Sequence, residues 1–179
     1  MTPLASKIKE NSIGHRIQKI DYSEINNPKG DFYFRGFHTF DYGMFITMSN
    51  GYQWHIIWKN DQSFTIGENI AEKKSIYTDN SKIWDATSEW ESYLDHEILG
   101  VDLQFLGDDG QSFSECTLSF INGESITILI DKELNINNII PKPLNYQDNG
   151  EIYIFFDQNL LVKSRSSATI KQNIVSSYE

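Results

Sequence analysis

The sequence has a single cysteine and no long apolar run. Cys116 is alone among 179 residues, so the chain can form no internal disulfide and no thiolate metal cage. No segment approaches the ~18 consecutive apolar residues of a membrane-spanning helix, and the first residues lack the apolar centre of a secretory signal. We therefore expect a soluble protein that begins at Met1 and stays in the cytoplasm.

Motifs for catalysis and metal binding are missing as well. The sequence contains no Gly-x-Ser-x-Gly elbow, no phosphate-binding loop and no Gly-x-Gly-x-x-Gly pattern. The four histidines, His15, His38, His55 and His96, are scattered, and none has the spacing of a metal ligand. Cys116 lies in an alternating strand pattern, which favours a buried, inert thiol. These absences predict a protein that is not an enzyme and uses no cofactor or metal, although two carboxylates could still meet across strands as an acid–base pair.

The charge is strongly one-sided. The chain has 25 acidic against 15 basic residues, a formal net charge of -10. Such a charge repels nucleic acid phosphates and anionic lipid headgroups, so we expect no direct nucleic acid or membrane partner. Acidity alone also serves solubility, so the partner must be sought in how the acidic residues are arranged.

What the chain does have is a series of short β-branched and aromatic runs separated by Asn, Gly and Asp, which is typical of antiparallel strands joined by turns. The expected strands are Ile17–Ile25, Phe32–Phe40, Met44–Ser49, Tyr52–Lys59, Ser63–Ile66, Ile98–Leu106, Ser114–Ile121, Ser125–Asp131, Ile152–Phe156 and Leu160–Ser164.

Two helices complete the expected fold. The segment Ser81–His96 places Ile83, Trp90 and Leu94 on one helical stripe. Ser88 and Glu91 have the spacing of a capping box, so the regular helix could start there, with the preceding residues as a turn or a bent first segment. A shorter helix is expected at Pro3–Glu10. The fold class predicted is therefore α+β, mainly an antiparallel β-sheet of two meanders, with one central helix and a short N-terminal helix.

A single α+β domain is expected over residues 1–165, followed by a mobile tail at 166–179. Asn50-Gly51 and Asn122-Gly123 each follow a strand, and both pairs suit a type I′ hairpin turn. Residues 13–70 and 97–165 could accordingly be two similar β-meander halves, or two unrelated hairpins that share a turn. The proline-containing segment Leu134–Gly150 is expected to be a long loop.

The strand after Asn50-Gly51 has a uniformly apolar face. Tyr52, Trp54 and Trp58 point to one side together with Ile56, and this pattern favours packing in the core. Indoles also stack on sugars, so a carbohydrate-binding platform is the alternative. The opposite face includes His55, which we expect to lie on a partly wet surface.

Carboxylates gather on the expected central helix. No Lys or Arg occurs between Lys82 and Glu97, so the face opposite the apolar stripe is acidic without the cations that usually stabilise a solvated helix. Acidic residues in neighbouring turns could extend this surface. The candidate partner-binding residues are Asp85, Glu89, Glu91, Asp95, Asp61, Glu68, Asp108 and Asp109.

A small, acidic, cysteine-poor chain with strand runs such as Gly51-Tyr-Gln-Trp-His-Ile-Ile-Trp-Lys-Asn-Asp61 and Gly100-Val-Asp-Leu-Gln-Phe-Leu106 resembles the bacterial immunity proteins of contact-dependent and polymorphic toxin systems. The resemblance is one of style over most of the chain and includes no diagnostic motif. It implies a protein that binds one cognate toxin domain, often a nuclease, and neutralises it in the producing cell. These proteins have varied folds, so the resemblance transfers no site residue.

Two function hypotheses follow. In the first, the acidic surface masks a basic toxin domain, because carboxylates on a rigid scaffold can fill a phosphate-binding cleft. In the second, the chain is a carbohydrate- or small-ligand-binding β module that uses exposed aromatic side chains. The exposure of Trp54 and Trp58 distinguishes them.

Overall fold

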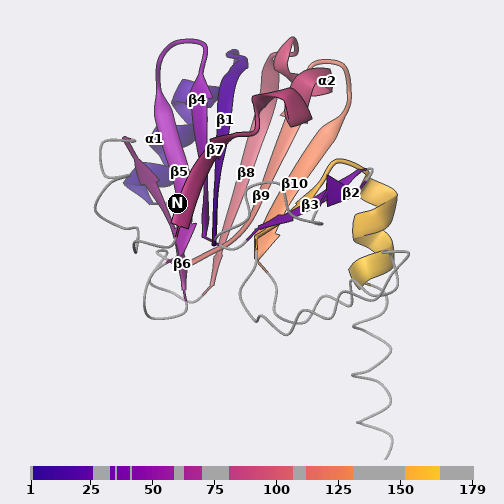
Figure 1. Cartoon of the computed structure of the whole chain (residues 1–179). Helices are drawn as coiled ribbons and strands as arrows, with labels where there is room; N and C mark the ends of the chain where they lie inside the picture. Colours follow the sequence, from indigo (N-terminus) through magenta and orange to yellow (C-terminus); the bar gives the residue numbers. More distant parts are fainter. Residues whose placement is uncertain are drawn as a thin grey trace, which may run out of the picture.

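The computed structural model describes residues 2–25, 33–34, 36–40, 42–58, 63–69, 81–106, 112–130 and 152–165. Within these ranges the chain forms a mainly antiparallel β half-barrel with short N-terminal, central and C-terminal helices (Figure 1). Ten strands of four or more residues and the two-residue β2 belong to one sheet. The expected mainly antiparallel architecture is confirmed.

The strands follow the predicted runs closely in most places. Their bounds are β1 (Ile17–Ile25), β2 (Tyr33–Phe34), β3 (Phe37–Phe40), β4 (Gly43–Met48), β5 (Gln53–Trp58), β6 (Phe64–Glu68), β7 (Ser81–Asp85), β8 (Ile98–Leu106), β9 (Ser112–Phe120), β10 (Ser125–Ile130) and β11 (Ile152–Phe155). The sheet order is β2-β3-β11-β10-β9-β6-β5-β4-β1-β7, and β8 pairs with β9.

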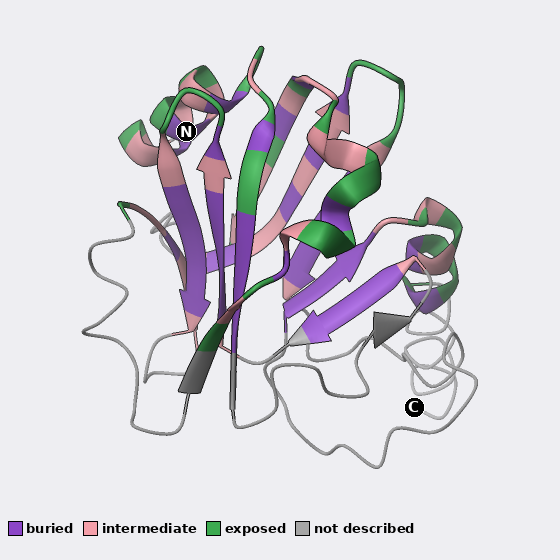
Figure 2. Cartoon of the chain, turned by 45° about the horizontal axis from the view of Figure 1, so that its top comes forward, coloured by how far each residue is buried: buried purple, intermediate pink, exposed green. Residues whose placement is uncertain are grey.

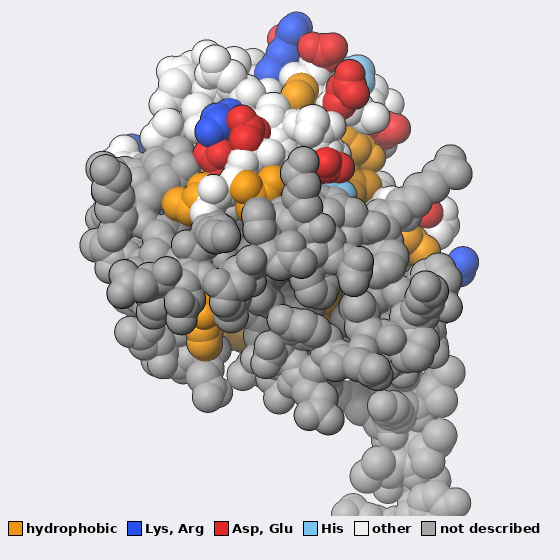
Figure 3. All heavy atoms as spheres, in the orientation of Figure 1, with side chains coloured by type: hydrophobic (Ala, Val, Ile, Leu, Met, Phe, Trp, Pro, Cys, Tyr) orange, Lys and Arg blue, Asp and Glu red, His pale blue; other side chains and the backbone are white. Residues whose placement is uncertain are grey.

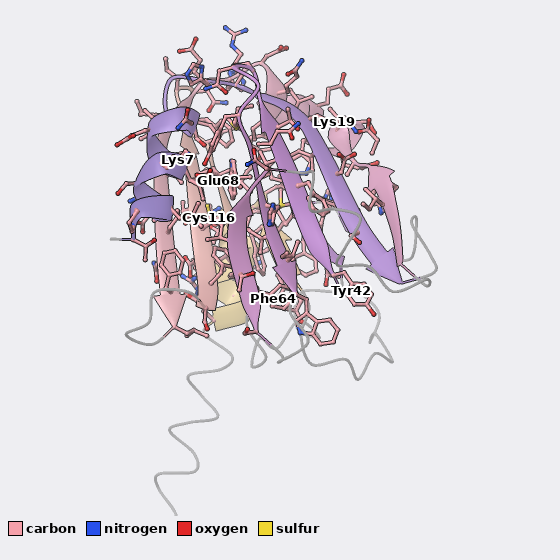
Figure 4. All side chains as sticks on the ribbon, turned by 90° about the vertical axis from the view of Figure 1, so that its left-hand side faces the viewer. Lys7, Lys19, Tyr42, Phe64, Glu68 and Cys116 are labelled. Carbon is pink, nitrogen blue, oxygen red and sulfur yellow. The ribbon has the colours of Figure 1, made fainter. Side chains whose placement is uncertain are left out.

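Among the residues that the structure describes, β6 and β9 pair at a single position, Thr65 with Ser112, so the sheet is nearly divided between these two strands. Helix α1 (Pro3–Ser12) joins the two parts. Its Lys7 forms an ion pair with Glu68 of β6, and its Lys9 lies 4.0 Å from Asp102 of β8. Figure 4 shows α1 beside these strands, with Lys7 above Glu68.

Local chemistry explains where α1 begins. Thr2 is the N-cap, and its hydroxyl accepts a 3.2 Å hydrogen bond from the Ala5 amide, while Pro3 occupies the first helical turn, where its missing N–H costs nothing. Ala5 and Ile8 are buried. The predicted N-terminal helix is confirmed, and it continues two residues beyond Glu10.

The main core lies against the sheet, and Figure 2 shows that most strands are buried along much of their length. Alternate residues of strands such as β4 and β10 belong to it, as the two-residue period of a strand requires. A second, smaller cluster lies under the helix at residues 158–165; its buried members are Phe37, Leu129, Tyr153, Phe155 and Leu161.

The predicted central helix over Ser81–His96 is wrong for its first part. Ser81–Asp85 is strand β7, which pairs with β1 from Ile25↔Ser81 to Asp21↔Asp85. A 3-10 turn, η2 (Thr87–Trp90), and a single α-helical turn, α2 (Glu91–Leu94), follow it. Ile83 is consequently an exposed strand residue rather than part of a helical stripe.

The prediction of a capping box at Ser88 and Glu91 is also wrong. Neither N-cap position in this segment makes a side-chain capping bond. The turn starts instead with Asp85, whose carboxylate accepts a 2.9 Å hydrogen bond from the Thr87 amide. An Asx-type bond of this kind replaces the expected Ser88–Glu91 cap.

Two further strand predictions fail. Phe32–Phe40 is not one strand, because Gly36 turns the chain at φ 83° between β2 and β3. Leu160–Ser164 belongs to the helix at residues 158–165, whose start is held by a 2.9 Å bond from the Asn159 amide to Asp157. Leu161 and Ser164, three residues apart, are its buried positions, which is helical spacing.

The two Asn-Gly turns have the same geometry, but it is not type I′. Only the glycine of each pair has positive φ, 83° at Gly51 and 85° at Gly123. In each turn the asparagine side chain accepts a 3.0 Å bond from the amide two residues ahead, in Tyr52 and Glu124. These are three-residue hairpin loops with glycine in the left-handed position.

Several expectations lie outside the described residues. These are the loop Leu134–Gly150, the tail 166–179 and the turns that contain Asp61, Asp108 and Asp109. The division of the chain into two similar halves stays a prediction. No helix in the part that the structure describes is long and apolar enough to span a membrane.

Candidate functional site

The candidate site is the acidic segment, residues 87–95, which connects β7 to β8. Glu89, Glu91 and Asp95 are all exposed on it. Among the described residues, none of these three carboxylates has a Lys or Arg within ion-pair distance. The segment lies at one end of the half-barrel, where Figure 3 shows acidic side chains grouped together with a few basic ones among them.

Trp90 anchors the acidic segment in the core. Its side chain is 0 % exposed, and its indole Nε1–H donates a 2.6 Å hydrogen bond to the Tyr22 hydroxyl of β1. The indole also meets the ring of Phe156 edge-to-face, with the centroids 5.1 Å apart. The neighbouring Tyr93 packs against Phe120 and Phe156. A segment of only two short turns is thus held in one orientation by buried aromatic contacts.

The hydrogen-bond chain continues to a buried histidine. The Tyr22 hydroxyl lies 3.0 Å from Nδ1 of His38 on β3. Since Trp90 donates to Tyr22, the tyrosine hydrogen is available for Nδ1, and the histidine acts as acceptor. Burial lowers the pKa of His38 from 6.5 to about 4, so the imidazole is neutral at pH 7. Three elements, β1, β3 and η2, are linked by this chain.

Other carboxylates add to the negative potential near the segment. Burial raises the pKa of Tyr93, and the charges of Glu124 and Asp157 raise it further. Glu124 is exposed in the turn between β9 and β10 and was not among the sequence candidates. Sequence reasoning missed it because only the fold places this turn beside the acidic segment.

Asp85 lies apart from the other carboxylates of the predicted helix. It is on β7, directly across from Asp21 of β1. Lys19 offsets both charges, with its Nζ 2.7 Å from Asp21 and 3.9 Å from Asp85. The hydrogen bond to Asp21, aided by both carboxylate charges, raises the pKa of Lys19. Asp85 therefore belongs to a charge cluster with Asp21 and Lys19 across the β1–β7 pair, and not to the acidic segment.

Glu68 is also compensated and lies elsewhere. It is on β6, where it pairs with Lys7 and accepts a 3.2 Å bond from the Tyr52 hydroxyl. The fold therefore brings Glu89, Glu91 and Asp95 together and separates them from Glu68. Asp61, Asp108 and Asp109 cannot be placed because they lie outside the described residues.

The aromatic face of β5 packs in the core, as predicted. Trp54 is fully buried, and Tyr52 and Trp58 are half-buried against the same cluster. Trp58 also packs on Tyr42, with ring centroids 5.5 Å apart. The prediction of a partly wet surface around His55 is wrong: this side chain is buried on the convex face, where its ring covers Gly67.

Cys116 is buried, as predicted. Burial raises the pKa of its thiol, and the nearby Asp102 and Glu115 raise it further. In the described part of the chain, no three His, Cys, Asp or Glu residues are grouped in a way that could hold a metal ion. The chain matches no protein-family model, no curated protein and no solved structure.

Proposed function

We propose that this chain is an immunity protein that binds and neutralises a basic toxin domain, with the acidic segment as the main point of charge contact. The observation that carries the proposal is that Glu89, Glu91 and Asp95 are exposed, and unpaired within the described ranges, on a segment anchored by a fully buried tryptophan. The resemblance in sequence style to bacterial immunity proteins agrees with it.

The anchoring matters because it prepares the carboxylates for binding. A flexible acidic loop would lose conformational freedom on meeting a partner, whereas a segment fixed through Trp90 and Tyr93 has already lost it. Carboxylates that have no ion pair within the described residues also have none to break before they bind a cation of the partner. Both features favour a binding role over a merely solvated acidic face.

The inhibitor would present its charges on a stiff support. We propose that this support is one meander used twice, β1–β4–β5–β6 in residues 13–70 and β8–β9–β10–β11 in residues 97–165, since Gly51 between β4 and β5 and Gly123 between β9 and β10 form the same three-residue loop. The protein would act in the cytoplasm of the producing cell, where it meets the toxin before export.

A carbohydrate- or small-ligand-binding module is the alternative. It would need an open indole face for stacking on a sugar ring. The burial of Trp54 removes the central residue of that platform, and Trp58 already packs on Tyr42. The inhibitor is therefore the better supported of the two.

The experiment starts from the gene directly upstream of this chain's gene. Its C-terminal domain is expressed in a bacterium with and without this chain. The proposal predicts arrested growth with the domain alone, normal growth when this chain is co-expressed, and a complex that co-purifies. An unrelated acidic protein of similar net charge serves as the control and should not restore growth. Arrest that this chain fails to relieve would contradict the proposal.

A further inference from the structure

Three backbone segments run side by side at the end of the half-barrel that carries the acidic segment. The Ile98 carbonyl accepts a 2.8 Å bond from the Gly14 amide, and the Ile98 amide donates a 2.9 Å bond to the His15 carbonyl. On the other side, the Ile121 amide donates a 3.0 Å bond to the Glu97 carbonyl. Residues 13–16, 97–99 and 119–121 are thus adjacent, in that order.

Each of these segments presents one large apolar side chain to solvent. Leu99 is 66 % exposed, Ile121 is 64 % exposed and Ile13 is 44 % exposed. We call these three residues the apolar corner. A single exposed leucine is ordinary in a folded protein, but three large apolar side chains exposed on hydrogen-bonded neighbouring segments mark a candidate contact surface. Burying such side chains against a partner removes their apolar surface from water, which favours binding.

The charges around the apolar corner are mostly negative. Arg16 lies 3.8 Å from Glu97, so these two groups largely offset each other. Asp95, two residues before Glu97, is exposed and unpaired among the described residues, and Glu124 is exposed in the turn after Ile121. The corner is therefore continuous with the acidic segment through residues 95–97, and its rim attracts cations.

We propose that the apolar corner is the anchor of the partner interface, occupied by an apolar protrusion ringed by Lys and Arg on the toxin domain. The inference rests on the proposed function and adds where the partner is held. Charge complementarity decides the occupant: a second copy of this chain would bring two acidic segments together, and each copy has a net charge of -10.

The two parts of the interface have separable roles. Long-range attraction by Glu89, Glu91 and Asp95 speeds encounter and weakens as salt screens it. Apolar contact in the corner forms only after docking, so it slows dissociation and is insensitive to salt. An interface that buries apolar groups inside a polar rim is the usual arrangement in specific complexes.

The test uses the purified C-terminal domain encoded directly upstream, immobilised for surface plasmon resonance. The double variant Leu99→Ser/Ile121→Ser is compared with wild type and with a control, Leu106→Ser/Val162→Ser, which removes two similarly exposed side chains away from the corner. We expect the Leu99→Ser/Ile121→Ser variant to dissociate about tenfold faster or more, with an association rate within about twofold of wild type. The control should match wild type.

The outcomes separate the two proposals. If wild type does not bind the domain, both the proposed function and the apolar corner as anchor are overturned. If wild type binds and the Leu99→Ser/Ile121→Ser variant dissociates no faster than the control, the anchor alone is overturned. Wild-type self-association that this double variant abolishes would show that the corner is a self-contact, which also overturns the anchor. Single variants Leu99→Ser and Ile121→Ser, checked by circular dichroism, replace the double variant if it fails to fold.

Discussion

At the scale of single residues, a short hydrogen-bond chain determines how the acidic segment is held. Trp90 donates to Tyr22, which lies 3.0 Å from the imidazole of His38. All three side chains are buried, so each of these two hydrogen bonds takes the place of one to water. The stability of the fold and the orientation of Glu89 and Glu91 therefore depend on the protonation state of His38.

Acidification should weaken the fold through His38. The folded pKa, about 4, lies below the unfolded value of 6.5, so the unfolded chain binds the proton more readily between these pH values. The contribution is therefore fully present above pH 6.5 and is lost as pH falls toward 4. At 1.36 kcal/mol per pKa unit, the loss is about 3 kcal/mol.

Urea unfolding of wild type and a His38→Gln variant over this pH range measures the contribution. The variant has no imidazole to protonate, so its free energy of unfolding should change less with pH than that of wild type. Carboxylates titrate in both proteins and cancel in the comparison. Parallel pH curves for the two proteins would refute the assignment.

Removing the anchor itself should cost more than removing a half-exposed aromatic residue. Trp90→Ala leaves a cavity and removes the indole N–H that the Tyr22 hydroxyl accepts, so the free energy of unfolding should fall by about 3–5 kcal/mol. Trp58→Ala, at a half-buried position, is the matched control and should cost less. Equal losses in chemical denaturation would mean that Trp90 does not anchor the segment.

At the scale of elements, the turn between β2 and β3 docks on the start of the C-terminal helix. The Gly36 carbonyl accepts bonds from the Phe156 and Asp157 amides, 3.0 Å and 3.1 Å long. A Cβ atom at Gly36 would lie 2.9 Å from the Cβ atom of Asp157. This contact leaves no room for a side chain and fixes the turn before β3 against the start of the helix that follows β11, the strand that pairs with β3.

Gly36→Ala should therefore be more costly than Gly51→Ala. Both glycines have φ 83°, so either alanine loses about 1–2 kcal/mol from its left-handed backbone. Only at Gly36 does the new methyl also meet Asp157, because nothing lies within 4 Å of the Cβ position at Gly51. Thermal melts should show a clearly larger drop in melting temperature for Gly36→Ala, and equal drops would argue against the docked turn.

The sequence predicted elements well where a strand's own pattern determines its extent. Ile17–Ile25 and Ile98–Leu106 were predicted to the residue, since alternation and flanking turns mark both. The prediction from sequence failed at Ser81–Asp85, because that strand is defined by pairing with β1, some sixty residues earlier in the chain. The strand predicted at Leu160–Ser164 failed for a similar reason: Asp157 starts a helix that covers a distant aromatic cluster.

The candidate site was partly visible in the sequence for related reasons. The absence of Lys and Arg between Lys82 and Glu97 indicated unpaired carboxylates, and Glu89 and Glu91 are unpaired among the described residues. Asp85 differs because Lys19 reaches it across the β1–β7 pair, which no local pattern encodes. The apolar corner was invisible for the same reason, since three separate segments build it.

At the scale of the whole molecule, carboxylates that pair with a cation and carboxylates that do not lie in different places in the described part. Most cations of the described part lie against carboxylates, as in Lys7 with Glu68 and Arg16 with Glu97. Glu89, Glu91 and Asp95 of the acidic segment have no such partner in the described part, so their negative charge is not offset there. A partner with a basic surface would meet this end first.

The most direct test of the account is the rate at which the upstream-encoded toxin domain associates with this chain, measured by stopped flow at low and high salt. The triple variant Glu89→Lys/Glu91→Lys/Asp95→Lys is compared with Asp102→Lys, which reverses an exposed charge on the outer face of β8. The account predicts an association rate that falls as salt rises, and a loss of about tenfold or more in the triple variant at low salt. Asp102→Lys should have a much smaller effect. An unchanged rate in the triple variant, with its fold intact, would contradict the account.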